Sequence, residues 1–149
     1  MGKAIARLDS GTHAVITAGE YRLHLDDPDD GGIGLGPNPE QMLAGTIGAC
    51  MAMTARLYAA RKDWPLEGVE VEVEFERYNA TDYPDYDGDA PFVHHFHEKM
   101  TLHGPLTEKQ RQRIAEIARK CPVRRAVMMP AFFSDELVEA EAETEAVIE

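Results

Sequence analysis

Two cysteines, Cys50 and Cys121, are the residues of this chain with the most distinctive chemistry. Two thiols are too few for a four-cysteine zinc site or for the disulfide framework of a small secreted domain. Two interpretations remain: the thiols are small hydrophobic residues of the core, or they form a redox-active pair. The composition alone leaves both open.

The surroundings of each cysteine predict different acidities for the two thiols. Cys50 lies in an apolar stretch, and apolar surroundings raise the pKa of a thiol. Cys121 is expected at a helix N-terminus beside several cations, which lower a thiol pKa. These cations are Lys120, Arg124 and Arg125. The residues alone therefore predict that Cys121 is the more acidic thiol.

Two histidines, His95 and His97, lie two positions apart and therefore share one face of a predicted strand. They could ligate a metal, but the sequence singles out no third ligand. If residues 69–76 and 92–102 pair as strands, the histidine face lies opposite a row of glutamates. Opposite charges across strands contribute about 0.2–1 kcal/mol each. We therefore expect charge pairs at this face in preference to a metal site.

A long helix is predicted around Cys50, over residues 39–62. Asn38 suits the N-cap, Pro39 suits the first helical position, and Glu40 favours the positive end of the helix dipole. The helix interior is small and apolar on almost every side, which indicates burial on most sides. We expect this central helix to pack against another copy of itself or against a second helix.

Cys121 follows a second predicted helix, which begins at a Thr107-to-Gln110 capping box and runs to about Lys120. Pro122 then suits the start of a short further helix that Cys121 would cap. Strands are predicted from β-like runs and from alternating polarity. They cover residues 3–8, 13–17, 21–25, 69–76 and 92–102.

Short turns between neighbouring strands imply antiparallel pairing, so the expected class is α+β with helices on one side of a sheet. Residues 26–37 form an acidic, glycine-rich loop that fits no phosphate-binding fingerprint. The tail from Ala131 to Glu145 is expected to be an edge strand or an exposed helix end.

The whole chain has 149 residues, a length that predicts one domain over residues 1–149. Its net charge of −12 argues against binding to nucleic acid and against an electrostatic membrane anchor. No apolar run approaches the ~20 residues that span a bilayer. No secretory signal is visible, so the expected location is the cytoplasm.

Three stretches occur in one order and spacing that resemble the OsmC/Ohr family of osmotically inducible and organic-hydroperoxide-resistance proteins. They are GPNPEQMLA with ACMAMT at residues 36–44 and 49–54, YAARKDWPLEGV at 58–69, and the stretch from Leu106 to Val123 that contains KCPV. The similarity covers nearly the whole chain. It implies an OsmC-like, intertwined homodimer with its sites at the subunit interface.

The resemblance also implies a thiol peroxidase that needs no cofactor or metal. By position, Cys50 is the peroxidatic cysteine, which attacks an organic hydroperoxide and becomes a sulfenic acid. Cys121 is the resolving cysteine, which condenses with it to a disulfide. A dithiol then reduces the disulfide, and in the Ohr branch lipoylated proteins serve. This assignment reverses the acidity order predicted from the residues.

Glu40 is a third site residue that the resemblance implies, because the family holds an activating arginine with the glutamate at this helix start. Ten positions separate Glu40 from Cys50, or about 15 Å along a helix, so the two cannot touch within one chain. Ohr-type members carry the arginine near the turn that matches residues 10–13, where this chain has none. Arg7 and Arg22 are the nearby candidates, and the chain resembles the broader OsmC-like branch more than Ohr itself.

One alternative function follows from the missing arginine. The chain would then be a non-catalytic OsmC-like protein that binds a small apolar ligand at the dimer interface, with inert thiols.

Overall fold

The elements follow the predicted order: three strands, a long helix, two strands, a second helix and a short third helix. The computed structural model describes residues 2–141. The chain is α+β, as predicted, and its described strands all pair in antiparallel fashion. The bounds are β1 Ile5–Arg7, β2 Ala14–Ala18, β3 Tyr21–Leu25, α1 Pro39–Arg61, β4 Gly68–Asn79, β5 Phe92–His103, α2 Glu108–Ala118 and α3 Pro122–Met128.

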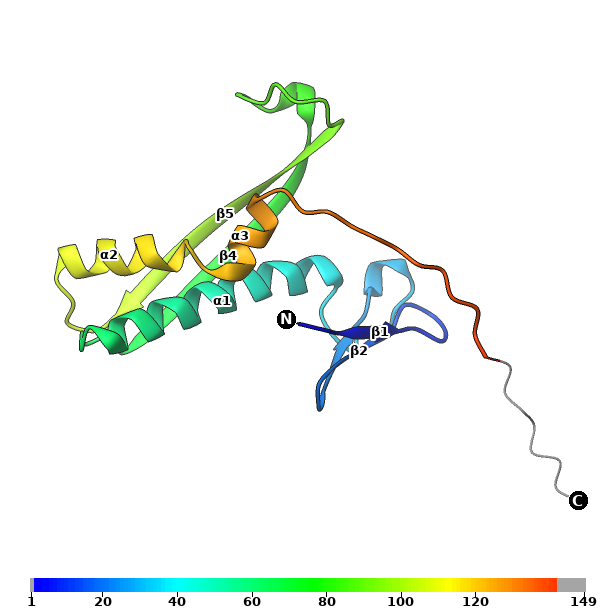
Figure 1. Cartoon of the computed structure of the whole chain (residues 1–149), viewed down its shortest axis with the longest axis horizontal. Coiled ribbons are helices and arrows are strands. Elements are labelled where there is room, and N and C mark those ends of the chain that lie inside the picture. The colour runs from blue at the N-terminus through cyan, green and yellow to red at the C-terminus, as the bar shows by residue number, and fades with distance from the viewer. Residues whose placement is uncertain (1, 142–149) are drawn as a thin grey trace, which may run out of the picture.

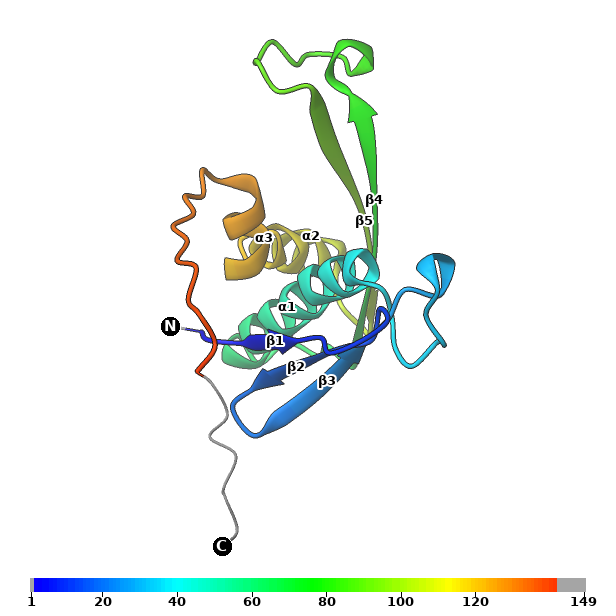
Figure 2. The same cartoon turned by 90° about the vertical axis from the view of Figure 1, so that its right-hand side faces the viewer.

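The strands form two sheets, which differs from the single sheet expected. β1, β2 and β3 make one sheet, and β4 and β5 pair along their whole length as a hairpin. The hairpin reaches well beyond the helices, while the three-stranded sheet lies apart from it, near the start of α1 (Figures 1 and 2). Alternating polarity predicts each strand but does not specify which sheet edges meet.

The hairpin separates an apolar face from a charged one, as its alternating sequence predicts. On the inner face Phe75 stacks on Phe96 with ring centroids 4.8 Å apart. On the outer face Glu74 is the register partner of His97, and the predicted glutamate row lies opposite the histidine and lysine row. This confirms the cross-strand arrangement expected for the histidine face.

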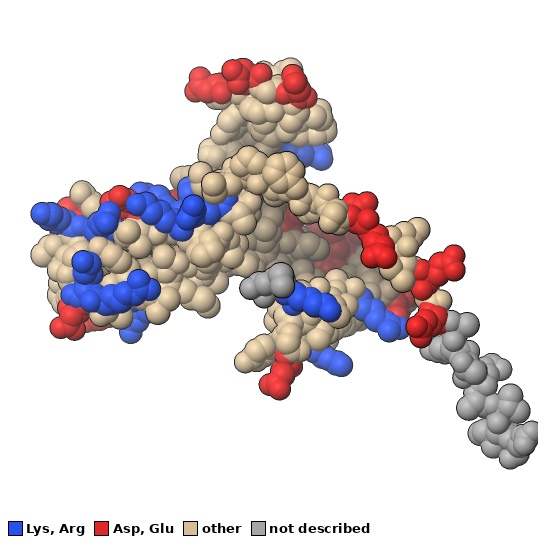
Figure 3. Space-filling view, viewed as in Figure 1, with Lys and Arg blue, Asp and Glu red and all other residues tan. Residues whose placement is uncertain are grey.

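Charge is unevenly distributed over the surface. Acidic side chains gather at the hairpin tip, while Lys and Arg side chains gather over α2 and the nearby end of α1 (Figure 3). The surface around α2 is therefore rich in basic side chains, although the net charge of the chain is −12.

The start of α1 is fixed by the predicted cap. Asn38 Oδ1 accepts a hydrogen bond from the backbone N–H of Gln41 at 2.8 Å, and the Gln41 side chain accepts one from the Asn38 backbone. Farther along, Gly48 lets the helix approach β4, because a Cβ there would lie 3.0 Å from the Val71 carbonyl oxygen. The helix thus lies directly on the apolar face of the hairpin.

The core lies between α1, α2, α3 and the hairpin. One face of α1 is fully buried there, together with residues from the loops before α2 and α3. The buried cluster consists of Ile47, Met51, Ala55, Ala59, Leu66, Leu106, Ile114, Ala118 and Cys121.

A second face of α1 is apolar but uncovered in the described chain. Leu43, Met53 and Leu57 are all exposed, and Met53 is 65% exposed. The prediction of a helix apolar on almost every side is therefore correct, while its burial within one chain is one-sided. No helix in residues 2–141 is both long and apolar enough to cross a membrane.

The glycine-rich loop after β3 is organised around one buried carboxylate. Asp26 accepts hydrogen bonds from the hydroxyl of Thr12 and from the backbone N–H groups of Asp27, Ile33 and Leu35, at 2.8–3.1 Å. The bonds from Leu35 and Thr12 are the main reason that the pKa of Asp26 lies well below its usual range.

The C-terminal tail departs from prediction. After α3 the described residues, up to Glu141, form neither a helix nor a ladder-paired strand. Phe132, Phe133 and Leu137 are each more than nine-tenths exposed. The tail residues expected to form an edge strand meet no sheet edge within the described chain. The predicted residues 142–145 lie outside the described part.

We predict that Asp26→Asn lowers the melting temperature by several degrees at about pH 7. Because folding lowers the pKa of Asp26, its carboxylate adds stability above the pKa of the unfolded side chain, 3.8, and that stability is lost as the pH falls through and below this value. Thermal melts should therefore show a gap in melting temperature between the unmodified protein and Asp26→Asn that is smaller at about pH 3 than at about pH 7. Asp27→Asn is the matched control, and an equal gap at both pH values would contradict the assignment.

Candidate active site

The two cysteines come together between α1 and α3. Cys50 is half-buried in the middle of α1, and it packs against the buried cluster that includes Cys121. Cys121 caps α3, as predicted, and its sulfur accepts a hydrogen bond from the backbone N–H of Arg124 at 3.4 Å. Both are free thiols. The fold thus brings together sulfurs that are 71 positions apart in the sequence.

Burial raises the pKa of the Cys121 thiol above its ordinary value, and it is the strongest influence on that group. The backbone N–H groups of Arg124 and Val123 act in the opposite direction. A hydrogen bond with the Cys50 side chain, and the negative charge of a Cys50 thiolate, raise the pKa further. The buried sulfur is therefore held as a thiol beside its half-buried neighbour.

The prediction that nearby cations lower the pKa of Cys121 is wrong. The guanidinium of Arg124 is directed at Glu98, with Nε 2.6 Å from Oε1. Lys120 is exposed and lies 3.7 Å from a surface carboxylate, and Arg125 is exposed as well. The cations are close in sequence, but desolvation of the thiol outweighs them because none is directed at the sulfur.

Sequence reasoning also missed the Glu98–Arg124 ion pair. The side chains are only 13% and 24% exposed, and the residues lie 26 positions apart. A signal was available: Glu98 is the one carboxylate on the face of β5 that carries Phe96 and Met100. A half-buried acid on an apolar face needs a partner.

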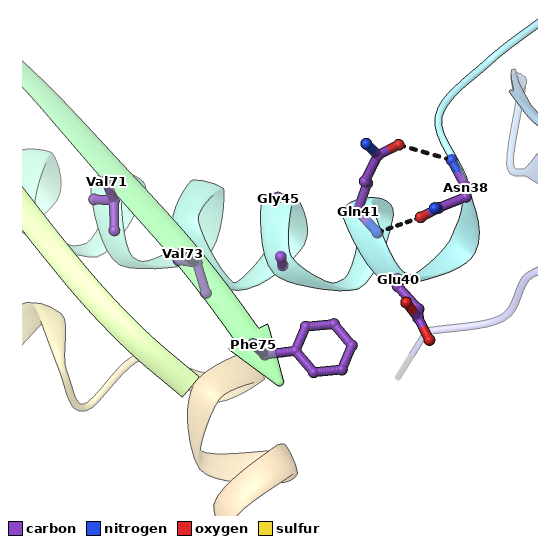
Figure 4. A pocket seen from close by; sticks show the side chains of 8 residues that line it. Asn38, Glu40, Gln41, Gly45, Val71, Val73 and Phe75 are labelled. Carbon is purple, nitrogen blue, oxygen red and sulfur yellow. Dashed lines mark hydrogen bonds between the residues drawn. The ribbon is translucent and has the colours of Figure 1, made fainter. Parts of the chain in front are cut away.

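Glu40 lies in the first turn of α1, exposed, beside an open pocket of about 380 Å³ (Figure 4). Gly45 and the apolar side chains of Val71, Val73 and Phe75 line the same pocket. Within the described residues the Glu40 carboxylate makes no hydrogen bond or ion pair. The structure therefore does not bring Glu40 to the two thiols within one chain.

An apolar groove runs from Glu40 toward the thiols. One cavity, of about 660 Å³, has Glu40 at one side, and a smaller one has Ile47 and Arg124 in its wall. The two cavities share lining residues, so they form one continuous depression. The shared residues are His94, Phe96, Val127 and Met128. Ile47 lies one helical turn before Cys50, which places the inner end of the groove near the thiol pair.

The two arginines named from the N-terminal strands lie elsewhere. Arg7, the last residue of β1, is paired with Asp9 at 2.9 Å, and both side chains are more than 70% exposed. Arg22 lies on β3 and is exposed as well. Within the described chain neither joins the buried cluster around the cysteines.

The histidines form no evident metal centre. Among residues 2–141, no group of three or more metal-binding side chains comes together. His95 and His97 lie on the outer face of the hairpin, opposite Glu76 and Glu74. Each of these histidines therefore faces a glutamate across the sheet, as the sequence predicts.

A sequence comparison supports a specific family. The family model described as OsmC-like protein matches residues 28–133. A comparison with curated proteins finds no match.

Solved structures share the fold. An organic hydroperoxide resistance protein OsmC from Legionella pneumophila is 23% identical with a TM-score of 0.61, over 84% of this chain and 88% of that chain. An OsmC-like protein from Mycoplasma pneumoniae is 20% identical with a TM-score of 0.65, over 86% and 87%. OhrB of Bacillus subtilis, an organic hydroperoxide resistance protein, is 21% identical with a TM-score of 0.58, over 85% and 90%.

We predict that Cys121 resists alkylation in the folded protein. Because its pKa is raised and its side chain is fully buried, iodoacetamide at about pH 8 should modify Cys121 at least about tenfold more slowly than a model thiol. Peptide mass spectrometry over time measures each cysteine separately. In urea both cysteines should react at the same rate, and fast labelling of Cys121 in the folded protein would contradict the prediction.

Proposed function

The chain belongs to the family of OsmC-like proteins, and from this membership we propose that it is a thiol peroxidase that reduces organic hydroperoxides. Cys50 is the peroxidatic residue and Cys121 the resolving residue. The observation that carries the proposal is that Cys50 on α1 packs against the buried cluster that contains Cys121, the cap of α3. Two adjacent thiols can cycle between a dithiol and a disulfide.

In the first step the Cys50 thiolate attacks one oxygen of the hydroperoxide. An S–O bond forms, the O–O bond breaks, and the departing alkoxide takes a proton to become the alcohol. Cys50 is oxidised to a sulfenic acid, and the peroxide is reduced. Its half-buried position supports this role, because a nucleophile must reach both the substrate and its resolving partner.

In the second step the sulfur of Cys121 attacks the sulfur of the Cys50 sulfenic acid. The S–S bond forms, the S–O bond breaks, and the hydroxyl leaves as water with the proton of the Cys121 thiol. The raised pKa of Cys121 supports this order of roles. A protonated, buried thiol is a poor first target for peroxide, yet it is positioned to trap the oxidised Cys50.

A dithiol from outside the chain must then reduce the disulfide, because the sequence contains no further cysteine. Thiol–disulfide exchange with such a donor restores both thiols. The family resemblance favours a lipoylated protein as the donor, and a reducing cytoplasm as the setting in which both cysteines rest as thiols.

The apolar groove supports a hydrophobic substrate. Leu43, Phe75, Phe96 and Met128 line its larger cavity. Burial of alkyl or aryl groups there contributes about 25 cal/mol per Å² of apolar surface, which hydrogen peroxide cannot gain. We therefore expect organic hydroperoxides to be preferred.

The working unit that we propose is a homodimer. The exposed apolar face of α1 and the exposed apolar residues of the tail are surfaces that a second copy would cover. Glu40 fits this arrangement, because its exposed carboxylate would hold a cation from the partner subunit rather than contact Cys50 of its own chain.

We predict that Cys50→Ser lowers cumene hydroperoxide turnover with a dithiol reductant by roughly 10³-fold or more, because the nucleophile is lost. Cys121→Ser should still consume about one equivalent of peroxide and then stop as a trappable sulfenic acid. Intact-mass spectrometry and a coupled dithiol assay measure the two outcomes. Hydrogen peroxide, tested in parallel, should react more slowly with the unmodified protein.

The same experiment separates catalysis from ligand binding. Thiols that stay free after excess hydroperoxide, or full turnover by Cys50→Ser, would contradict the peroxidase. Either result would favour the non-catalytic OsmC-like binding protein.

We also predict that Met53→Lys weakens the homodimer by about thirtyfold or more, because a charge would be buried at the centre of the interface. Gln112→Lys, an exposed position on α2, is the matched control and should leave assembly unchanged. Light scattering across a dilution series measures the dissociation. A monomeric unmodified protein, or equal behaviour of both variants, would contradict the assignment of this face.

A further inference from the structure

The inner face of β5 carries one residue that does not suit its surroundings. Phe96, Met100 and Leu102 on this face pack against the buried cluster, and Glu98 stands among them with a side chain only 13% exposed. Desolvating a carboxylate is costly, and half-buried ion pairs seldom stabilise a fold more than apolar residues of similar shape. A contribution to the free energy of folding therefore does not explain why a glutamate lies at this place in the strand.

The partner of Glu98 touches the thiol site directly. Arg124 donates from Nε to Glu98 at 2.6 Å, and its backbone N–H donates to the sulfur of Cys121 at 3.4 Å. Its Nη1 also reaches the carbonyl of Arg119 at 3.2 Å and the sulfur of Met128 at 2.8 Å. One residue thus connects the turn that carries Cys121 to the hairpin.

This connection is narrow. In the described chain the Glu98–Arg124 pair is the only hydrogen bond or ion pair between α3 and β5. α3 has seven residues and otherwise packs against α1. The pair is therefore the one polar contact that holds α3 to the hairpin in the described chain.

We propose that Glu98 and Arg124 are positioning residues that hold the Cys121 sulfur in line with Cys50 for disulfide formation. This inference rests on the proposed peroxidase function and names the residues that control its second step. Neither residue touches the reacting atoms through its side chain. They act by fixing the helix that begins at Cys121.

The pair would control how the Cys50 sulfenic acid is consumed. In the productive route, Cys121 attacks it, the S–S bond forms and water leaves. In the competing route, a second hydroperoxide transfers one oxygen to the sulfenic acid, which becomes a sulfinic acid while the peroxide becomes an alcohol. The intramolecular route is fast only while the two sulfurs are aligned, since small misplacements cost large factors in rate.

The test compares Glu98→Gln and Arg124→Gln with Arg125→Gln, an exposed arginine on the same helix. Each protein receives cumene hydroperoxide at increasing excess, and mass spectrometry reports the disulfide and sulfinic fractions. We expect both pair variants to form the disulfide roughly tenfold more slowly once Cys50 is oxidised, and to convert a larger share of the oxidised Cys50 to sulfinic acid. Arg125→Gln should behave like the unmodified protein.

A double-mutant cycle and a rescue variant exclude a general loss of structure. Glu98→Gln/Arg124→Gln should be no worse than either single variant, because both remove the same contact. Arg124→Lys should restore part of the resolution rate, since it keeps the charge. Additive effects, or a similar defect in Arg125→Gln, would overturn the positioning role.

A second oxidant separates this inference from the peroxidase proposal. Oxidised glutathione forms a mixed disulfide with one cysteine, which the other displaces with release of glutathione, so no peroxide chemistry is involved. The pair variants should again close the Cys50–Cys121 disulfide roughly tenfold more slowly. Normal closure in the variants would overturn the inference whatever the peroxide result. A protein inert to hydroperoxide but sensitive to these substitutions would overturn only the peroxidase.

Discussion

The contact between the two thiols depends on how closely α1 lies on the hairpin. Gly48 permits this approach, because a Cβ would press against the Val71 carbonyl. With α1 held there, Ile47 and Met51 enter the core, and the chain returns through β5 and α2 to place Cys121 in the same cluster. Side chains 71 positions apart thus meet because one helix approaches one strand at backbone distance.

At this contact, desolvation decides the chemistry of Cys121. Three basic residues follow or precede it closely in sequence, yet the raised pKa of the thiol follows burial. The effect of a charge on a neighbouring group weakens as the distance between them grows and as the medium between them becomes more polar. Arg124 is committed to Glu98, and the remaining two side chains point into solvent.

Much of this structure could be predicted from local patterns. The caps at Asn38 and Thr107, the alternating faces of the hairpin and the capping position of Cys121 are encoded in short stretches, where few alternatives compete. Local patterns could not predict the division into two sheets, the unpaired tail or the raised pKa of Cys121, because each depends on which distant surfaces meet. Glu98 is intermediate: its place in an apolar pattern signals a partner, but the pattern does not name Arg124.

The Glu98–Arg124 pair also bears on which group could ionise Cys50. An arginine bound to a carboxylate at 2.6 Å has little net charge to offer a nearby sulfur, so its role differs from that of a cation that ionises a thiol. In our proposal, the groups that position Cys121 therefore differ from the group that would activate Cys50. In the described chain, Arg7 and Arg22 lie outside the thiol cluster, and the Glu40 carboxylate is unpaired at the outer end of the groove. If Cys50 is the peroxidatic thiolate that we propose, the cation that ionises it would come from beyond these contacts. The uncovered face of α1, which runs between Glu40 and Cys50, is the surface through which the proposed second copy would bring it.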